Sequence, residues 1–543
     1  MNLLLGVLVV LKSELIFRLC PTLLVSICMA ESSLAAYDTP NVIVVMVDDM
    51  GYSDLGCFGS AIETPAIDSL ASGGVTFNNF YNTARCWSTR ASLMTGLYPH
   101  QSNKAMSFGS KAPFGYQGDI PRDTKFISEL LQTRGYSTYH VGKWHLNNRT
   151  SAVEQSWPLG RGFDNSYCIV SQNNFFAPWR MRDESQIIVR PKDPRQWPQD
   201  YYMTTAIGQR SRDYLDSHLR DSPDKPFFLY VAHTAPHFPL HAPADVIAKY
   251  LGKYMQGWDE ERKRRQSALR QKGIVKTKLS ERDEEAVAWN SLSREEQIEW
   301  DSRMAVHSAM IDVVDQEVGR LVSLLKKRGI FEDTVIFFLS DNGASAEVLI
   351  RGDGDDVTAP PGSAASYECL EVGWSNACNT PFRQHKMWTH EGGISTPLIV
   401  HWPNGRIANG TINKQVGHVI DLVPTIMDIV KKRLPSTTNY PGESLLGTIR
   451  SGNTRGRMLF WEHLGNRAIR HGYWKAVLEY EQPWQLYDMR NDRGETIDLA
   501  KNRPALLSKL TLKWDDWADA SSVVPWPSLQ EFHPNYRFKY KRK

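Results

Sequence analysis

The stretch NVIVVMVDD, residues 41–49, joins an apolar run to a pair of carboxylates and sets the pattern for much of the chain. Its first seven residues predict a buried strand. Similar runs alternate with amphipathic stretches, which predicts an α/β fold with a large mixed, mostly parallel sheet between layers of helices. Strands are predicted at 75–81, 226–234, 334–340 and 397–403, a helix followed by a strand within 126–142, and helices at 64–74 and 304–329.

Two segments depart from this pattern. Residues 250–303 are charged and helix-prone, and they predict a solvated helical insertion. From about residue 451 the sequence predicts an antiparallel hairpin sheet followed by a terminal helix near 503–518. The chain is therefore expected to divide into a large domain, 37–450, and a smaller C-terminal α+β subdomain, 451–543.

The composition is that of a globular protein with a sizeable core. Hydrophobic residues make up 41% and charged residues 23% of the 543 residues, which excludes a disordered, collagenous or coiled-coil chain. Lys plus Arg number 63 against 60 Asp plus Glu, and a net charge of +3 lacks the concentrated basic charge that nucleic-acid binding needs. Aromatic residues reach 11%; most are expected in the core, although flat aromatic faces also suit sugar rings.

The amino terminus predicts export. Two apolar blocks, 3–11 and 19–30, are separated by charged residues, and small residues follow at 33, 35 and 36. Residues 1–36 are therefore interpreted as the signal peptide of a secreted or periplasmic protein. Each block is shorter than the ~20 residues that cross a bilayer, so no stable membrane span is expected, and a retained anchor is the alternative.

An odd number of cysteines remains after such a cleavage. In an oxidising compartment, an odd cysteine suggests that one of them has a separate task. Cys369 and Cys378 bracket a short loop and are candidates for a disulfide. The five remaining cysteines are Cys57, Cys86, Cys168, Cys369 and Cys378.

Polar side chains follow two of the predicted buried strands. Asp48 and Asp49 come directly after the first strand, and Asp341 and Asn342 follow the strand at 334–340. Sites in open α/β sheets lie outside the carboxyl ends of the strands. Carboxylates gathered there would repel one another without a cation, and all-oxygen ligation suits Ca²⁺ or Mg²⁺. A helix cap or a turn is the alternative role for each Asp.

A lone cysteine stands at the start of a predicted short helix in RCWSTRASLMTGLYPH, residues 85–100. Cys86 has Arg85 and Arg90 as neighbours, and the amino end of a helix favours anions. The residue types alone therefore indicate a thiolate nucleophile, with a buried structural cysteine as the alternative.

This segment resembles the signature of the type I sulfatases, Cys-x-Pro-Ser-Arg followed by x-x-Leu-x-Thr-Gly. The resemblance extends over about residues 40–405, and the tail at 486–500 is similar to the usual sulfatase carboxyl-terminal domain. It implies an alkaline-phosphatase-like fold and the arylsulfatase-A-like subgroup. The other marks of the family follow in order: the Asp48-Asp49 pair, GYSTYHVGKWHL (135–146), RGFD (161–164), TAPHFPL (234–240), LSDNG (339–343) and KMWTHEGG (386–393).

The resemblance implies that residue 86 is oxidised after translation to Cα-formylglycine by a maturation enzyme. Its hydrate, stabilised by Arg90, would attack the sulfur of a sulfate ester. The second hydroxyl of the hydrate would then expel sulfate, which a serine or cysteine ester could not do. One Ca²⁺ would lie beside residue 86, held by Asp48, Asp49, Asp341 and Asn342.

The remaining roles also come from the resemblance. Lys143 and Lys386 would neutralise charge on the sulfonyl oxygens, and His237 or Lys386 would protonate the departing alcohol. His145 would help to deprotonate the second hydroxyl. The alternatives are an exposed turn for Lys143 and His145 and an ordinary core position for His237. His463 and Arg467 are expected to reach the site from the C-terminal subdomain.

The signature departs from the family pattern at two positions. Ser88 stands where the family has Pro, and Thr89 replaces the usual Ser. Thr89 keeps the hydroxyl, whereas Ser88 is expected to weaken recognition by maturation enzymes that favour Pro.

The main hypothesis is thus a Ca²⁺-dependent sulfuric-ester hydrolase that acts on sulfated carbohydrates. Two alternatives stay open: a phosphodiesterase or phosphonate monoester hydrolase of the same superfamily, and a noncatalytic sulfoglycan-binding protein with an unconverted Cys86. The loops at 104–120, 172–200 and 345–380 are expected to select the substrate.

Overall fold

A computed structural model of the chain describes most of it from residue 39 onward. The predicted signal peptide, 1–36, lies outside the described residues. The described ranges are 39–147, 154–170, 173–177, 181–183, 186–188, 200–348, 356, 358–452 and 456–532.

The central strand of the main sheet is the one that the opening stretch predicts. β1 (Asn41–Val47) pairs in parallel with β7 (Phe227–Ala232) on one side and with β8 (Thr334–Ser340) on the other. All three strands are buried along their whole length. Because helices cover both faces of the sheet, the side chains on both faces of the strand are apolar, and polar and apolar residues do not alternate along it.

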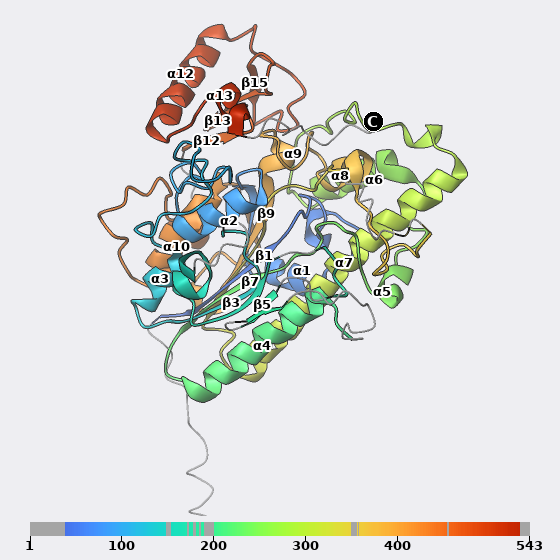
Figure 1. Cartoon of the computed structure of the whole chain (residues 1–543). Coiled ribbons are helices and arrows are strands. Elements are labelled where there is room, and N and C mark those ends of the chain that lie inside the picture. The colour runs from blue at the N-terminus through green and yellow to red at the C-terminus, as the bar shows by residue number, and fades with distance from the viewer. Residues whose placement is uncertain are drawn as a thin grey trace, which may run out of the picture. The chain divides into compact units, whose positions relative to one another are not determined.

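Within the described residues, the main sheet has eleven strands in the order β10-β2-β9-β8-β1-β7-β3-β4-β5-β6, with β11 beside β2 (Figure 1). β9 runs antiparallel to both of its neighbours, as does β5, and the other pairs are parallel. This confirms the predicted mixed, mostly parallel sheet. The remaining strands are β2 (Val75–Tyr81), β3 (Ser137–Lys143), β4 (Asn165–Ile169), β5 (Met181–Asp183), β6 (Gln186–Ile188), β9 (Ser395–His401), β10 (Thr411–Asn413) and β11 (Gly417–His418).

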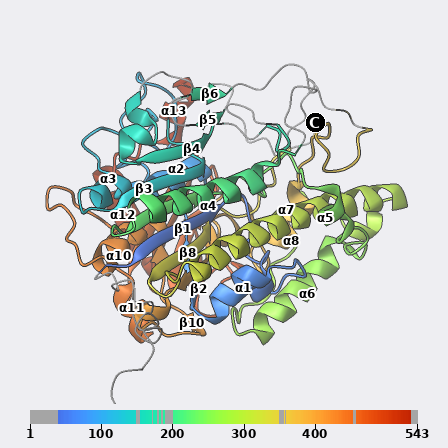
Figure 2. The same cartoon turned by 90° about the horizontal axis from the view of Figure 1, so that it is seen from below.

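Two helical layers divide the side chains of β1 between them. Ile43, Val45 and Val47 join the core beneath α1, α4 and α7, whereas Val42 and Val44 join the core beneath α2, α3 and α10. Figure 2 shows α4 and α7 side by side across the first face. The helices are α1 (Pro65–Ser72), α2 (Cys86–Thr95), α3 (Ile127–Gln132), α4 (Met203–Asp221), α5 (Ala244–Ala248), α6 (Gly257–Gln271), α7 (Arg294–Lys327), α8 (Glu371–Cys378), α9 (Glu391–Ile394), α10 (Leu422–Ile429), α11 (Leu446–Ser451), α12 (Pro504–Ala520) and α13 (Trp526–Leu529).

The longest helix begins ten residues before the predicted start at 304. Ser293 caps α7 by accepting a hydrogen bond from the backbone N–H of Glu296 at 3.2 Å, and the Glu296 carboxylate accepts one from the Ser293 N–H at 2.8 Å. This capping box sets the start of a helix regardless of the charged residues that follow. The predicted start at residue 304 was wrong, because the charged residues before it already belong to this helix and most of them lie on its exposed side.

The charged segment 250–303 is only partly solvated. Its helix α6 buries Trp258, Arg265 and Leu269 against the main domain. Arg265 is fully buried because it pairs with the Asp54 carboxylate at 2.6 Å. The segment therefore supports the loop that follows β1.

The C-terminal part forms a separate antiparallel sheet, as predicted. Its four strands follow one another in order and are β12 (Met458–His463), β13 (Asn466–His471), β14 (Trp474–Leu478) and β15 (Gln485–Asp488). Leu510 and Trp514 of α12 pack on Ile469 and Ala476 of this sheet. The terminal helix thus covers one face of the sheet, close to its predicted place.

Buried ion pairs join this sheet to the main domain. Glu391 of α9 accepts from Lys475 of β14 at 3.0 Å and from Arg493 at 2.7 Å, and Lys475 also lies 2.7 Å from Glu495. Such pairs are costly to break because one partner would stay buried without compensation. The network therefore fixes the position of the C-terminal sheet.

None of the five cysteines in the described ranges forms a disulfide. The suggested pairing of Cys369 with Cys378 is wrong, because neither forms a disulfide. Cys369 precedes α8 and Cys378 is its last residue. The eight residues of α8 rise about 10.5 Å from first to last, whereas the Cα atoms of a disulfide lie within about 7 Å. Within the described residues, no helix has the length and apolar character needed to cross a membrane.

Close backbone packing just after β8 makes Gly343 sensitive to substitution. A Cβ at this position would lie 1.8 Å from the carbonyl oxygen of Gly392, whereas a Cβ at Gly447 of α11 would have no atom within 4 Å. We expect Gly343→Ala to lower the free energy of unfolding by about 3 kcal/mol or more, because overpacking must move the backbone. Urea unfolding followed by circular dichroism, with Gly447→Ala as control, tests this. Equal stabilities would contradict the packing described here.

Candidate active site

Four oxygen-bearing side chains meet where β1 and β8 end. Val47 and Ser340 are neighbours in the parallel pairing, so the residues that follow them emerge side by side. The backbone N–H of Asp49 donates to Asp341 at 3.3 Å, and the amide of Asn342 donates to Asp49 at 2.7 Å. The structure thus brings together Asp48, Asp49, Asp341 and Asn342, as the sequence predicts.

This cluster fits a hard cation. All four side chains are at most 2% exposed, and the Asp48 Oδ1 and Asn342 Oδ1 atoms accept no hydrogen bond from the described part of the chain. Burial and the neighbouring Asp48 carboxylate raise the pKa of Asp341 to about 7. Buried acceptors without partners cost free energy, and an oxygen-only donor set suits Ca²⁺ or Mg²⁺.

Three cations lie against the carboxylates. Arg90 of α2 donates through Nε to Asp341 at 2.9 Å, Lys143 at the end of β3 donates to Asp48, and Lys386 donates to Asp49 at 2.9 Å. Burial alone would raise the pKa of Asp48, but positive charge from Lys143 and its neighbours outweighs burial and holds that pKa far below the usual range. Lys143 is 2% exposed, so the alternative of an exposed turn is wrong for it.

Cys86 is the first residue of α2 and is 2% exposed. Burial raises the pKa of its thiol, and the charges of Lys143 and Lys386 offset only part of that effect. The unmodified thiol is therefore protonated at neutral pH. This disfavours the simple thiolate nucleophile that the residue types alone suggest.

Two histidines flank the carboxylates and Cys86. The His237 Nδ1–H donates to its neighbour's carbonyl, that of Phe238, at 2.6 Å, and Nε2 lies 3.5 Å from Asp49 Oδ2. His145 has a left-handed backbone, with φ of 59°, and its ring lies 5.4 Å from that of Trp87. Burial and the charge of Lys143 lower the pKa of His145 well below its usual value, so its imidazole is neutral.

Glu347 is a site residue that the sequence reading missed. One of its oxygens lies 3.0 Å from the Lys386 ammonium, and the other lies 3.4 Å from the Arg85 guanidinium. Although burial raises the pKa of Glu347, these two cations hold it well below the usual range. The sequence offers only a weak signal for it: Glu347 follows Asn342 by five residues, in a loop expected to select the substrate.

The loop after β1 is held in place by a second buried cluster. Asp54 accepts from the Gly51 N–H at 2.9 Å, from Arg265 at 2.6 Å and from His307 at 3.1 Å. Burial alone would raise the pKa of Asp54, but Arg265 and His307 lower it to about 2. Arg265 neutralises the buried Asp54 carboxylate. The three contacts to Asp54 together hold the loop that carries Asp48 in a fixed position.

Three other histidines near the motifs have structural partners. His100 bonds to Glu462 at 2.8 Å, His140 to Ser166 at 2.9 Å and His385 to Asp283 at 2.9 Å. Of the two residues expected from the C-terminal sheet, His463 lies near Trp87, with ring centroids 6.3 Å apart. Arg467 instead lies 4.7 Å above the ring of Trp514.

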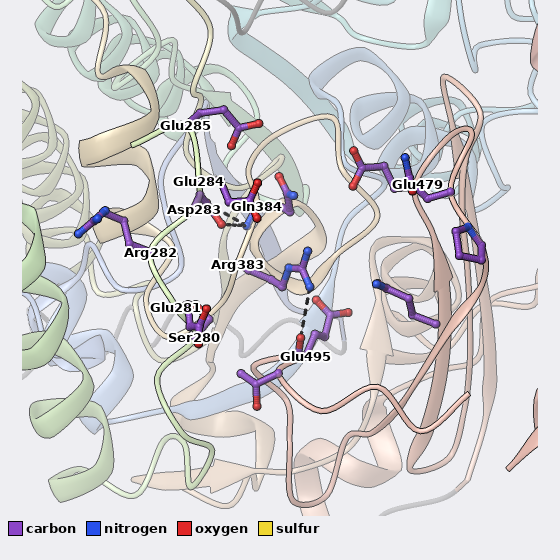
Figure 3. A pocket seen from close by; sticks show the side chains of 14 residues that line it. Ser280, Glu281, Arg282, Asp283, Glu284, Glu285, Arg383, Gln384, Glu479 and Glu495 are labelled. Atoms are coloured by element: carbon purple, nitrogen blue, oxygen red, sulfur yellow. Dashed lines mark hydrogen bonds between the residues drawn. The ribbon is translucent and has the colours of Figure 1, made fainter. Parts of the chain in front are cut away.

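A cavity of about 590 Å³ lies near this site but has the wrong charge for a sulfate (Figure 3). It opens between residues 280–285, the segment 383–384 and the C-terminal sheet. Its wall contains six carboxylates and two guanidinium groups, contributed by Glu281, Asp283, Glu284, Glu285, Glu479, Glu495, Arg282 and Arg383. Such a wall repels polyanions.

A family model described as Sulfatase matches residues 40–432 of this chain. The chain belongs to the sulfatase family. It is an enzyme that hydrolyses sulfuric esters, which confirms the resemblance of the motifs to this family.

Relatives of this enzyme match over most of its length. An uncharacterized sulfatase of Schizosaccharomyces pombe is 30% identical over 92% of this chain and 97% of its own length. An arylsulfatase of Klebsiella aerogenes is 30% identical over 74% of this chain and 89% of its own. The crystal structure of Ps i-CgsB superposes with a TM-score of 0.64 at 26% identity, covering 90% and 94% of the two chains, and that protein is also solved with k-i-k-neocarrahexaose.

Removal of Arg90 should destabilise the fold far more than removal of an exposed arginine. Arg90→Met leaves Asp341 and Asp48 buried with less compensation, and we expect a loss of about 3–5 kcal/mol in the free energy of unfolding. Arg328→Met, which breaks the exposed pair with Asp216, should cost several-fold less. Urea unfolding of both variants measures the difference. Equal losses would show that Arg90 does not compensate the buried carboxylates.

Proposed function

We propose that the enzyme cleaves sulfate esters with residue 86 as Cα-formylglycine and with one Ca²⁺ held by Asp48, Asp49, Asp341 and Asn342. One observation carries this proposal. Cys86 begins α2 at a point where the charges of Lys143, Lys386, Asp48 and Asp341 all act on its side chain.

The charge balance of the site supports a bound dication. When Asp341 is ionised, above its pKa of about 7, the four carboxylates of Asp48, Asp49, Asp341 and Glu347 face the four cations Arg85, Arg90, Lys143 and Lys386, and the two sets cancel. A bound divalent ion would leave the site positive, which suits a sulfate ester. Bound at the carboxylate cluster, Ca²⁺ would supply charge that neutralises the sulfonyl oxygens.

Residue 86 would provide the reacting atoms in its oxidised, hydrated form. Such a hydrate offers one hydroxyl for attack on sulfur, with loss of the alcohol, and a second hydroxyl whose deprotonation expels sulfate and restores the aldehyde. Arg90, buried between Asp341 and the Tyr230 hydroxyl, fixes the positive charge beside this residue. Lys143 and Lys386 orient the sulfate and neutralise the charge that develops on it.

The proton transfers fall to the two histidines and Lys386. His145 is suited to accept the proton of the second hydroxyl, because its buried Nδ1 has no partner among the described residues. His237 or Lys386 donates a proton to the departing alcohol, since both side chains lie beside the same carboxylate oxygen, Oδ2 of Asp49. His237 and Lys386 are therefore both candidates for the proton donor.

Maturation requires that an enzyme accept Ser88 in the signature. The Ser88 hydroxyl donates to the Arg85 carbonyl at 3.0 Å and accepts from Thr83 at 3.0 Å. Ser88 lies in the first turn of α2, where a Pro is also tolerated because the backbone N–H has no partner within the helix. We propose that residues 1–36 direct export and that a formylglycine-generating enzyme converts Cys86.

The proposed substrates are sulfated carbohydrates. The similar protein Ps i-CgsB is solved with k-i-k-neocarrahexaose, and mouse N-acetylgalactosamine-6-sulfatase is 29% identical over 87% of this chain. The proposed domain division, 37–450 and 451–543, places the signature and the cation cluster in the first domain.

We expect the mature enzyme to hydrolyse 4-nitrophenyl sulfate in preference to bis(4-nitrophenyl) phosphate. Cys86→Ala should lose at least about 10³-fold in kcat/KM, because the reacting atoms are removed. Cys57→Ala, which changes a half-buried cysteine outside the site, should keep wild-type turnover. Release of 4-nitrophenol measures both. Preferential cleavage of the phosphate diester would favour the phosphodiesterase alternative, and binding without turnover would favour the sulfoglycan-binding protein.

Calcium should stabilise the chelator-treated enzyme. At a Ca²⁺ concentration 100 times the Kd, linkage predicts about 2.7 kcal/mol of added stability. The rise in the thermal midpoint should disappear in Asp341→Asn and persist in Asp216→Asn, an exposed carboxylate elsewhere. Differential scanning fluorimetry and calorimetric titration measure this. No calcium-dependent rise, or an equal rise in both variants, would refute the proposed site.

A further inference from the structure

The C-terminal sheet places one unpartnered histidine beside the signature helix. Trp461 and His463 lie on the same face of β12 because side chains alternate along a strand. The Trp461 indole donates to the carbonyl of Asn82 at 2.8 Å, just before the segment that leads into α2. His463 lies two residues further along the same strand, with its ring centroid 6.3 Å from that of Trp87.

The hairpin that carries His463 is tightly constrained. His463 pairs with Asn466, and the two residues between them, Leu464 and Gly465, have φ of 56° and 84°. A leucine in the left-handed region is strained, and such strain persists only where packing enforces it. Leu464 is 1% exposed in a cluster with Met387 and Trp526, which supplies that packing. The position of His463 is therefore rigid.

The surroundings of His463 belong to the proposed active site. Its ring lies 6.3 Å from that of Trp87, which is the residue after Cys86, and the Trp87 ring in turn lies 5.4 Å from His145. The Arg85 guanidinium lies 4.6 Å above the same Trp87 ring, and Arg85 is linked through Glu347 to Lys386. One side of the site is therefore formed by residues that the sulfate chemistry does not require.

The His463 side chain is 3% exposed, and its Nε2 has no hydrogen-bond partner within the described chain. Cys86 and Lys386, which the proposed function places beside the substrate, have similarly small exposed fractions of 2% and 1%. Burial and the nearby Arg85 lower the pKa of His463 well below its usual value. A neutral imidazole can both donate to and accept from a hydroxyl, but it offers no charge for a second anionic group.

We infer that His463 is a specificity residue that hydrogen-bonds a hydroxyl of the sugar carrying the sulfate. This inference rests on the proposed function, since it assumes that a sulfate ester occupies the site next to residue 86. Arg85 and Glu347 complete the same wall with planar charged groups, which suit the remaining hydroxyls of the sugar ring. An enzyme that binds a substrate hydroxyl through a buried group discriminates strongly against substrates lacking that hydroxyl.

The test compares two substrates in the full-length enzyme. One is 4-nitrophenyl sulfate, which has no sugar. The other is the best substrate in a set of monosaccharide sulfates. The set contains galactose sulfated at O2, O4 or O6 and N-acetylgalactosamine sulfated at O4 or O6. His463→Ala should raise KM for the sugar sulfate at least about 10-fold and change kcat/KM for 4-nitrophenyl sulfate less than about 2-fold. His463→Gln, which keeps a donor and an acceptor, should recover part of the loss.

His471→Ala, at the exposed end of the neighbouring strand β13, is the matched control and should change neither substrate. Equal losses for both substrates in His463→Ala would overturn the inference, as would no change in either. Turnover of 4-nitrophenyl sulfate by an enzyme inactive on every sugar sulfate would also overturn it. Failure of the wild-type enzyme on all sulfates would instead refute the proposed function.

Discussion

Three carboxylates are buried at the ends of two adjacent strands, and their negative charge determines which side chains surround them. Parallel pairing of β1 with β8 brings Asp48, Asp49 and Asp341 together away from water. Three buried negative charges cannot persist without compensation. Arg90 and two lysines supply that compensation, and they come from α2, from the end of β3 and from the segment before α9. Elements distant in sequence therefore each contribute a cation to the same group of buried carboxylates.

Much of this could be predicted from the sequence because it depends on local patterns. The buried strand 41–47, the carboxylates after it and the helix that begins at Cys86 are all visible in runs of a few residues. Glu347 could not be placed in the same way, because its role comes from contacts with Lys386 and Arg85, 39 and 262 positions away. The start of α7 was mispredicted because a run of charged residues looks alike in a solvated loop and on the outer side of a helix.

The C-terminal sheet connects fold and substrate choice. It is anchored by the buried pair of Lys475 with Glu391 and by the indole of Trp461 on Asn82. These contacts use buried charge and a tight hairpin rather than a large apolar interface alone. The same anchoring places His463 beside Trp87, the residue that follows Cys86. The groups proposed for catalysis thus come from the main domain, whereas His463 comes from the C-terminal sheet.

We propose that residue 86 acts as an aldehyde rather than as the thiol that burial keeps protonated. Mass spectrometry of the peptide containing residue 86, from protein produced in its native host, tests this most directly. We expect the mass of the formylglycine form or its hydrate. A peptide that carries only the unmodified cysteine, from protein without sulfatase activity, would contradict it.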